Sequence, residues 1–128
     1  MQKAIICVDD EKSISWGVQQ QIARSFPNKY LLEIAESGEE ALEILQEFKE
    51  MNIELFMLIT DQMMPGIKGH ELIKEINEKS PSSKCILLTG YAEENILNQV
   101  SNLNVYKILK KPWEFEELAR SISEADTN

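Results

Sequence analysis

Three aspartates stand directly after apolar segments of this sequence, where their carboxylates could serve one site. Asp9 and Asp10 follow KAIICV, and Asp61 follows ELFMLIT. Carboxylates that share a site repel one another, so a proton or a cation has to offset their charge. Oxygen ligands suit a hard cation such as Mg²⁺, and a carboxylate can itself attack phosphorus to form an aspartyl phosphate. The aspartates therefore indicate magnesium-dependent phosphoryl transfer.

A hydroxyl and an amine could complete such a site. Thr89 ends the segment KCILLT, and Lys111 follows VYKILK. The lysine and the metal would neutralise phosphoryl oxygens, and the threonine would donate a hydrogen bond to another. Each residue alone has a plainer explanation: Asp9 and Asp10 as helix N-caps, Thr89 as an ordinary strand end, Lys111 as a solvated lysine. Only their joint occurrence after four apolar segments favours a common site.

The segments that must position these residues alternate between short apolar runs and longer amphipathic stretches. We expect strands at 3–8, 30–36, 54–60, 84–89 and 105–109, whereas helical spacing of apolar residues recurs within 14–26, 41–45, 72–76, 96–100 and 115–122. This alternation predicts an α/β domain whose parallel sheet is covered on both faces. Ligands of such sheets bind beyond the carboxyl ends of the strands. The strand ends named above would therefore converge at one edge.

Size and charge narrow the class of protein. The chain has 128 residues, enough for one domain with a real core, and a formal net charge of −9. This charge argues against nucleic acid and anionic membrane as partners, because phosphate groups need a basic face. The apolar runs are shorter than a membrane span or a signal peptide requires, so we expect a cytoplasmic location with Cys7 and Cys85 as buried thiols.

Four motifs resemble those of the receiver domain of two-component response regulators. They are VDDE at 8–11, ITDQMMPGIKG at 59–69, LLTGY at 87–91 and LKKPW at 109–113. Their order and spacing both agree with the family. The resemblance covers essentially all positions, and it implies one receiver domain over residues 1–128 with a flavodoxin-like, doubly wound (βα)5 fold and strand order 2-1-3-4-5.

The resemblance also implies a metal site and a phosphoacceptor. Asp61 corresponds to the residue that accepts the phosphoryl group, and it is also an expected ligand of the metal. Asp9 and Asp10 correspond to the acidic pair that holds Mg²⁺, with Asp10 as a direct ligand. The backbone carbonyl of Met63 would be a further ligand.

Other implied roles concern the switch. Thr89 is similar to the hydroxyl that moves toward the phosphoryl group, and Lys111 to the lysine that contacts phosphate, with a cis peptide expected at Lys111–Pro112. One position departs from the family pattern: Ile108 stands where many receivers have an aromatic residue. Tyr106, two residues earlier, is expected on the same strand face.

Gln62 and His70 are polar residues that lie near Asp61 in the sequence, and the two tryptophans are expected at helix starts. Gln62 occupies a position that could tune the lifetime of the phosphoryl group. His70, the single histidine, is expected to be a partly exposed residue at a helix start. Trp16 and Trp113 are expected to pack at the starts of their helices.

The implied function is a signalling switch that is not an enzyme in the usual sense but promotes its own phosphorylation and dephosphorylation. A sensor histidine kinase or a phosphotransfer protein would donate the phosphoryl group. An output domain or partner would bind the face formed by residues 92–124, and a phosphorylation-dependent homodimer is a further expectation. Three alternatives stay open on the sequence: a haloacid-dehalogenase-type phosphohydrolase, a flavodoxin-type flavin module, and a degenerate receiver that only binds partners.

Overall fold

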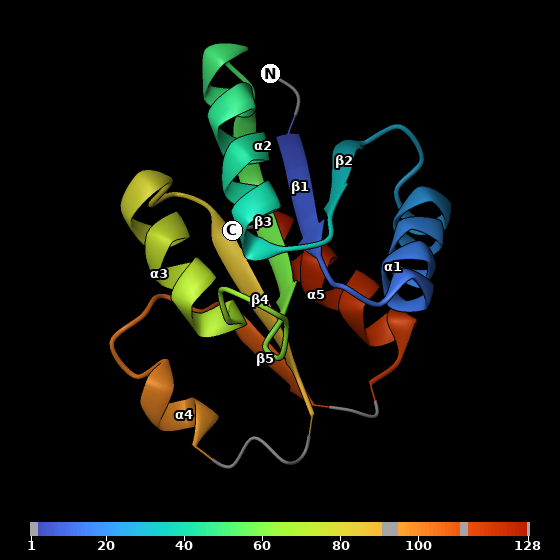
Figure 1. The fold of residues 1–128 in the computed structure, drawn as a ribbon. Helices are drawn as coiled ribbons and strands as arrows, with labels where there is room; N and C mark the ends of the chain where they lie inside the picture. The colour runs from blue at the N-terminus through green and yellow to red at the C-terminus, as the bar shows by residue number, and fades with distance from the viewer. Residues whose placement is uncertain (1–2, 91–94, 111–112, 128) are drawn as a thin grey trace.

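The computed structural model describes residues 3–90, 95–110 and 113–127, and within them five strands alternate with five helices (Figure 1). The elements in chain order are β1 (Lys3–Val8), α1 (Lys12–Ser25), β2 (Tyr30–Ala35), α2 (Gly38–Glu50), β3 (Glu54–Asp61), α3 (Gly69–Lys79), β4 (Lys84–Thr89), α4 (Ile96–Gln99), β5 (Lys107–Lys110) and α5 (Phe115–Asp126). The predicted strands are thus confirmed to within two residues at each end.

All five strands pair in parallel, in the order β2-β1-β3-β4-β5. This arrangement confirms the predicted flavodoxin-like fold. The strand order reverses direction at β1, which lies between β2 and β3. The crevice beyond the carboxyl ends of β1 and β3 is therefore the switch point at which such sheets bind ligands.

Helices cover both faces of the sheet, and two apolar clusters fill the spaces between (Figure 1). Alternate residues of a strand point to opposite faces, so β1 contributes Ile6 and Val8 to one cluster and Ile5 and Cys7 to the other. Helices α2, α3 and α4 pack on the first face, and α1 and α5 on the second. Burial on both faces explains why these strands read as continuous apolar runs.

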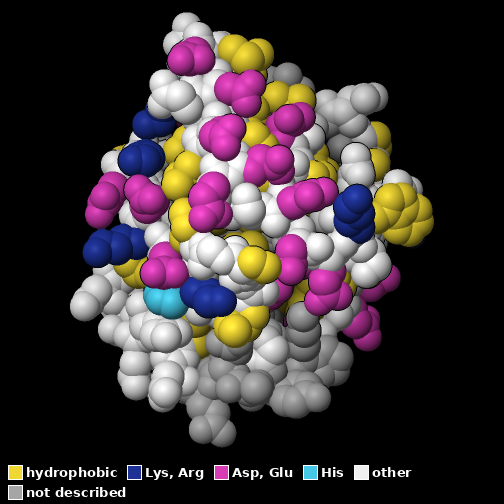
Figure 2. Space-filling view, in the orientation of Figure 1, with side chains coloured by type: hydrophobic (Ala, Val, Ile, Leu, Met, Phe, Trp, Pro, Cys, Tyr) yellow, Lys and Arg dark blue, Asp and Glu magenta, His cyan; other side chains and the backbone are white. Residues whose placement is uncertain are grey.

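The outer face of α2 is acidic. Its solvent-exposed glutamates are Glu39, Glu40, Glu43, Glu47 and Glu50, and Figure 2 shows acidic side chains gathered along this side of the molecule. Such a face repels phosphate groups. No helix in the described part of the chain is long and apolar enough to span a membrane.

The prediction that Tyr106 shares a strand face with Ile108 is wrong. Strand β5 begins only at Lys107, so the alternation of a strand does not extend back to Tyr106. Ile108 packs against the cluster under α2 and α3, whereas Tyr106 packs on the opposite face, where the Lys84 Nζ atom lies 5.3 Å from its ring centroid. Tyr106 therefore does not substitute for the missing aromatic side chain.

Two other side chains are more exposed than the sequence indicates. Trp16 is 64% exposed on α1, and Leu97 is 62% exposed on α4. Trp113 does pack as predicted, with its ring edge-on to Phe115 at 5.2 Å. Helix α4 spans only one turn, which leaves room for Ile96 but not for Leu97 in the apolar cluster.

At the amino edge of the sheet, one carboxylate collects three hydrogen-bond donors. Asp126, near the end of α5, forms ion pairs with Lys3 at 2.5 Å and Lys29 at 3.4 Å and accepts a hydrogen bond from the Tyr30 hydroxyl. The Tyr30 ring stacks on Phe56 at 5.4 Å. These contacts tie the last helix to β1 and β2. We call Lys3, Lys29, Tyr30 and Asp126 the amino-edge cluster.

Candidate functional site

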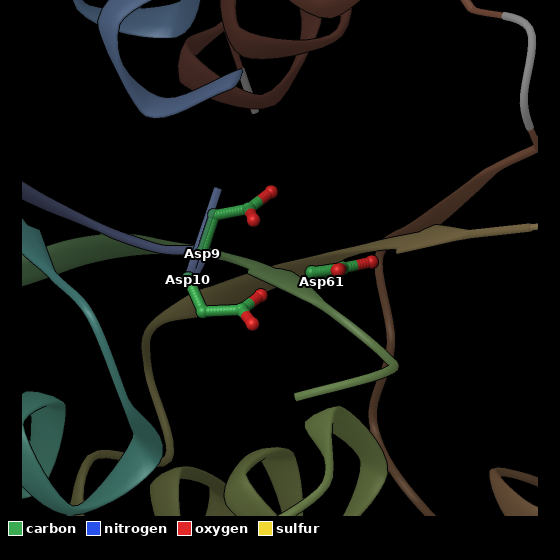
Figure 3. A group of neighbouring side chains, drawn as sticks. All are labelled: Asp9, Asp10 and Asp61. Carbon is green, nitrogen blue, oxygen red and sulfur yellow. The ribbon is translucent and has the colours of Figure 1, made fainter. Parts of the chain in front are cut away.

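The three aspartates named from the sequence meet at the carboxyl edge. Asp9 and Asp10 follow β1, and Asp61 is the last residue of the neighbouring β3. One carboxylate oxygen from each lies within 4.8 Å of the other two, and the three carboxylates project to the same side (Figure 3). Asp9 and Asp61 are buried, whereas Asp10 is exposed. Three carboxylates at this spacing can hold a divalent cation.

The carboxyl group of Asp9 is destabilised in its ionised form. Burial, together with the negative charges of Asp61, Glu11 and Asp10, raises the pKa of Asp9 from 3.8 to about 6. One hydrogen bond opposes this shift, because the Glu11 backbone N–H donates to Asp9 Oδ1 at 2.8 Å. A cation bound between the carboxylates would reverse the effect and favour the ionised form.

The N-capping alternative for Asp9 and Asp10 is wrong. Helix α1 begins after Glu11, which is its N-cap residue and makes no capping hydrogen bond through its side chain. Asp9 binds the backbone of Glu11 itself, which lies outside the first helical turn. The two aspartates are therefore held near the end of β1 for a reason other than helix capping.

Thr89, at the end of β4, is fully buried, and its hydroxyl has no hydrogen-bond partner within the part of the chain that the structure describes. A buried hydroxyl without a partner costs free energy, so it signals a missing ligand or a functional role. Strand β4 pairs with β3 one residue away, at Asp61 and Leu88. The hydroxyl is thus free to donate a hydrogen bond within the described part of the chain.

The backbone that carries Asp61 is held tightly against α3. A Cβ atom added at Gly69 would lie 2.5 Å from the Asp61 carbonyl oxygen and 2.9 Å from the Gln62 Cα atom, so no side chain fits there. The following loop is closed by Lys68, whose Nζ atom donates to the Met64 carbonyl at 2.9 Å. Close contact with the helix therefore limits how Asp61 can move.

Gln62 is used in a way that its sequence position does not reveal. It is 2% exposed, and its side-chain amide bonds to His70 rather than facing the space beside Asp61. His70 is partly exposed at the start of α3, as predicted. The sequence did contain one indication of this role, because Gln62 directly follows a buried strand. A buried amide needs hydrogen-bond partners.

The remaining predicted site residues are Met63 and Lys111. Met63 lies in the loop between β3 and α3, and its side chain is 54% exposed. Lys111 and the Lys111–Pro112 peptide lie outside the described residues. The preceding residue, Lys110, ends β5 in register with Thr89. After Thr89, an added Cβ at Gly90 would meet none of the described atoms within 4 Å.

Comparison with protein families gives one match across most of the chain. Residues 5–123 match the family described as "Response regulator receiver domain". The chain is 32% identical over 120 residues to the transcriptional regulatory protein YesN of Bacillus subtilis and 28% identical over 120 residues to the sensor kinase CckA of Brucella abortus. Each alignment covers 94% of this chain.

These relatives are larger proteins. The chain spans 31% of YesN and 12% of CckA. The DNA-binding transcriptional regulator NtrC of Escherichia coli is 27% identical, and the chain spans 25% of its length. The shared segment is therefore a module that occurs beside different partner domains.

Solved structures agree with the sequence matches. The signal receiver domain of an HD domain-containing protein from Pseudomonas fluorescens superposes with a TM-score of 0.84 at 27% identity, covering 99% of this chain and 96% of that one. The chemotaxis response regulator CheY4 of Vibrio cholerae, at 22% identity and a TM-score of 0.78, shares the fold. These matches set aside the phosphohydrolase and flavin-binding alternatives.

Proposed function

The chain belongs to the response regulator receiver domain family and is thus a phosphorylation-dependent signalling switch, and we propose that it accepts a phosphoryl group on Asp61 in a Mg²⁺-dependent reaction. The observation that carries this proposal is the cluster of Asp9, Asp10 and Asp61 at the switch point of the sheet. The proposal treats residues 1–128 as one receiver domain.

Asp61 is the best-suited nucleophile of the three aspartates. It is the last residue of a strand that is buried on both faces, and Gly69 holds its backbone close to α3. A fixed nucleophile reduces the entropy that must be lost to reach an in-line geometry. Asp9 and Asp10 come from the adjacent strand, so they are well placed to bind a cation beside Asp61 without blocking it.

The chemistry consists of a phosphoryl transfer to Asp61 and a later hydrolysis, in which a water oxygen bonds to phosphorus while the bond to the Asp61 oxygen breaks and inorganic phosphate leaves. An Asp61 carboxylate oxygen forms a bond to phosphorus while the bond from phosphorus to the donor nitrogen breaks, and the leaving imidazole takes a proton. Mg²⁺, bound to Asp9, Asp10, Asp61 and the Met63 carbonyl, would neutralise charge on the phosphoryl oxygens. The Thr89 hydroxyl and Lys111 would each contact a phosphoryl oxygen. The same groups would then assist hydrolysis by water.

Thr89 supports a link from the site to the rest of the domain. Its buried hydroxyl lacks a partner within the described residues, so a new phosphoryl oxygen would give it one. Movement of Thr89 would favour a second arrangement of the neighbouring elements. We propose that the output partner binds the face formed by residues 92–124, where Leu97 is exposed.

The phosphoryl donor in this proposal is a sensor histidine kinase or a phosphotransfer protein in the cytoplasm. Ile108 occupies the position of the usual aromatic switch residue, and Tyr106 packs on the other face of the sheet. In this proposal, the conformational change would be transmitted through aliphatic packing at Ile108. A homodimer that forms on phosphorylation would be one output of this change.

The test is phosphorylation by a small-molecule donor. Purified protein is incubated with acetyl phosphate and Mg²⁺, and the adduct is followed by intact mass and by its lability in base. We expect an acid-stable, base-labile adduct that requires Mg²⁺ and is absent from Asp61→Asn. An adduct of equal yield on Asp61→Asn would overturn the assignment, as would the absence of an adduct on the wild-type protein.

A further inference from the structure

Gln62, the residue that follows Asp61, joins three elements through hydrogen bonds. Its backbone N–H donates to the Leu88 carbonyl of β4 at 2.9 Å, and its carbonyl accepts from the Gly69 N–H of α3 at 3.0 Å. Its side-chain Oε1 accepts from the His70 backbone N–H at 2.8 Å. Gln62 therefore satisfies two of the amides at the start of α3 that have no partner within the helix.

Helix α3 needs this external cap. Its N-cap residue is Lys68, whose side chain has no acceptor and makes no capping bond. The Glu71 carboxylate accepts from the Lys68 N–H at 2.8 Å, which leaves the amides of Gly69 and His70 to Gln62. Gln62 thus caps the N-terminus of α3, as a Ser, Thr, Asp or Asn side chain does at most helix starts.

The second amide atom of Gln62 defines the chemical state of His70. Because Oε1 faces a backbone N–H, the Nε2 group of Gln62 must face the His70 ring, and Nε2 lies 2.7 Å from Nδ1. An amide NH₂ group only donates, so Nδ1 must accept and carry no proton. While this hydrogen bond is formed, Nδ1 of His70 is the acceptor, so a proton on the ring can only be on the Nε2 atom of His70.

We propose that Gln62 and His70 form a positioning pair that holds the Asp61 carboxylate and the Met63 carbonyl in the orientation needed for Mg²⁺ binding and phosphoryl transfer. Gln62 lies between these two groups in the chain, so its torsion angles set their relative direction. Gln62 makes hydrogen bonds through both amide atoms and through both backbone groups, and these bonds restrict the conformations that it can adopt. The inference rests on the proposed function, since it concerns the same site.

The experiment compares two substitutions at one position. Asn at 70 can present an acceptor oxygen near the place of Nδ1, whereas Phe keeps a ring and removes the acceptor. His70 lines a surface cavity of about 460 Å³ beside α3, so a phenyl ring has room there. In both His70→Asn and His70→Phe, the backbone N–H of residue 70 can still donate to Gln62 Oε1. The two variants therefore differ only in whether Gln62 Nε2 has an acceptor.

Three quantities are measured for each protein: the dissociation constant for Mg²⁺ by calorimetry, the rate of phosphorylation by acetyl phosphate at saturating Mg²⁺, and the melting temperature. For His70→Phe we expect Mg²⁺ binding about five-fold weaker and phosphorylation about ten-fold slower, the scale of losing one partly buried hydrogen bond. We expect His70→Asn to stay within about two-fold of the wild type in both. A lower melting temperature for His70→Phe with unchanged binding and rate would mean a purely structural role and would overturn the proposal.

Nitrogen-15 NMR of the wild-type protein checks the geometry independently. We expect the His70 Nδ1 resonance of an unprotonated ring nitrogen; a proton on Nδ1 in the neutral ring would contradict the pair. The two levels of failure are distinct. If the wild type is phosphorylated on Asp61 and His70→Phe matches it, only the pairing fails. If the wild type is not phosphorylated on Asp61, the proposed function and the pairing fail together.

Discussion

The two edges of the sheet differ in the charges that surround their carboxylates. At the amino edge, the Asp126 carboxylate lies among Lys3, Lys29 and the Tyr30 hydroxyl. Burial opposes its ionisation, but these hydrogen bonds outweigh burial and hold the pKa of Asp126 below its usual value. At the carboxyl edge, three carboxylates lie together, and the pKa of the Asp9 carboxyl is raised to about 6.

The difference separates stability from function. The amino-edge cluster brings opposite charges together and joins the two ends of the chain, which favours the folded state. The aspartate cluster brings like charges together, which disfavours the folded state until a cation binds. A buried group that is costly in the unliganded protein is a sign that the protein is arranged for a ligand.

The largest expected effect is the loss of the phosphoacceptor. Asp61→Asn keeps the shape of the side chain and removes the nucleophile, so we expect no phosphorylation by acetyl phosphate. Removing one negative charge from the carboxyl edge should also lower the pKa of Asp9, since Asp61 raises it. Mass spectrometry measures the first effect, and titration of the Asp9 carboxyl followed by NMR measures the second. An unchanged Asp9 titration would show that the two carboxylates do not interact.

The next effect is stabilisation by the cation. Mg²⁺ at about 100 times its dissociation constant should raise the free energy of unfolding by about 2.7 kcal/mol, because it binds the folded state alone. Urea denaturation with Mg²⁺ and with a chelator measures the difference. Asp10→Asn, which removes an exposed ligand, is the matched control and should show a smaller gain at the same Mg²⁺ concentration. An equal gain in both proteins would place the cation elsewhere.

Breaking the amino-edge cluster should affect stability without affecting function. Asp126→Ala leaves two lysines and a tyrosine hydroxyl without their shared acceptor, and we expect it to cost about 2 kcal/mol, a value reduced because Lys3 and Lys29 remain partly exposed. Urea denaturation measures the cost. The rate of phosphorylation should equal that of the wild type. A slower rate would mean that the two edges are coupled, contrary to the separation drawn above.

The smallest effect is a pH dependence of the metal-free protein. The pKa of Asp9 is about 6 in the folded state, whereas an unperturbed aspartate, as in the unfolded state, has a pKa of 3.8. Between these pH values the folded state therefore binds more protons than the unfolded state. The contribution of Asp9 to stability is therefore full below about pH 4 and is lost as the pH rises to about 6. Asp9→Asn should remove this loss and should therefore be more stable than the wild type above pH 6.

Denaturation curves of both proteins in a chelator, from pH 4 to pH 8, measure this difference. Other carboxylates change the stability of both proteins equally, so only the difference between the two curves reports on Asp9. A constant difference across the range would contradict the raised pKa. At saturating Mg²⁺ the wild type should be the more stable protein, because the Asp9 carboxylate can then bind the cation and the amide of Asp9→Asn cannot bind it as well.

Short apolar runs made most of the fold predictable, because strands buried on both faces have to be continuously apolar. The aspartates were predictable for a related reason, since a carboxylate directly after such a strand has to lie at one edge of the sheet. Tyr106 was misplaced because the start of β5 depends on pairing with β4, which no local pattern reveals.

Contacts between distant residues could not be predicted. Lys3 and Asp126 are 123 positions apart, and Tyr30 and Asp126 are 96 apart; no periodicity links them. The bond between Gln62 and His70 spans only eight positions, but it depends on the loop that turns the chain back toward β3. Sequence patterns therefore indicated which residues gather at an edge, and the folded chain determined which atoms meet.

Gly69 and Gly90 differ in the space that surrounds them. An additional methyl group at position 69 would act as a wedge between β3 and α3, directly on the peptide that carries Asp61, whereas one at position 90 would meet none of the described atoms. Alanine is thus excluded at the first glycine, whereas no atom in the described part of the chain excludes it at the second.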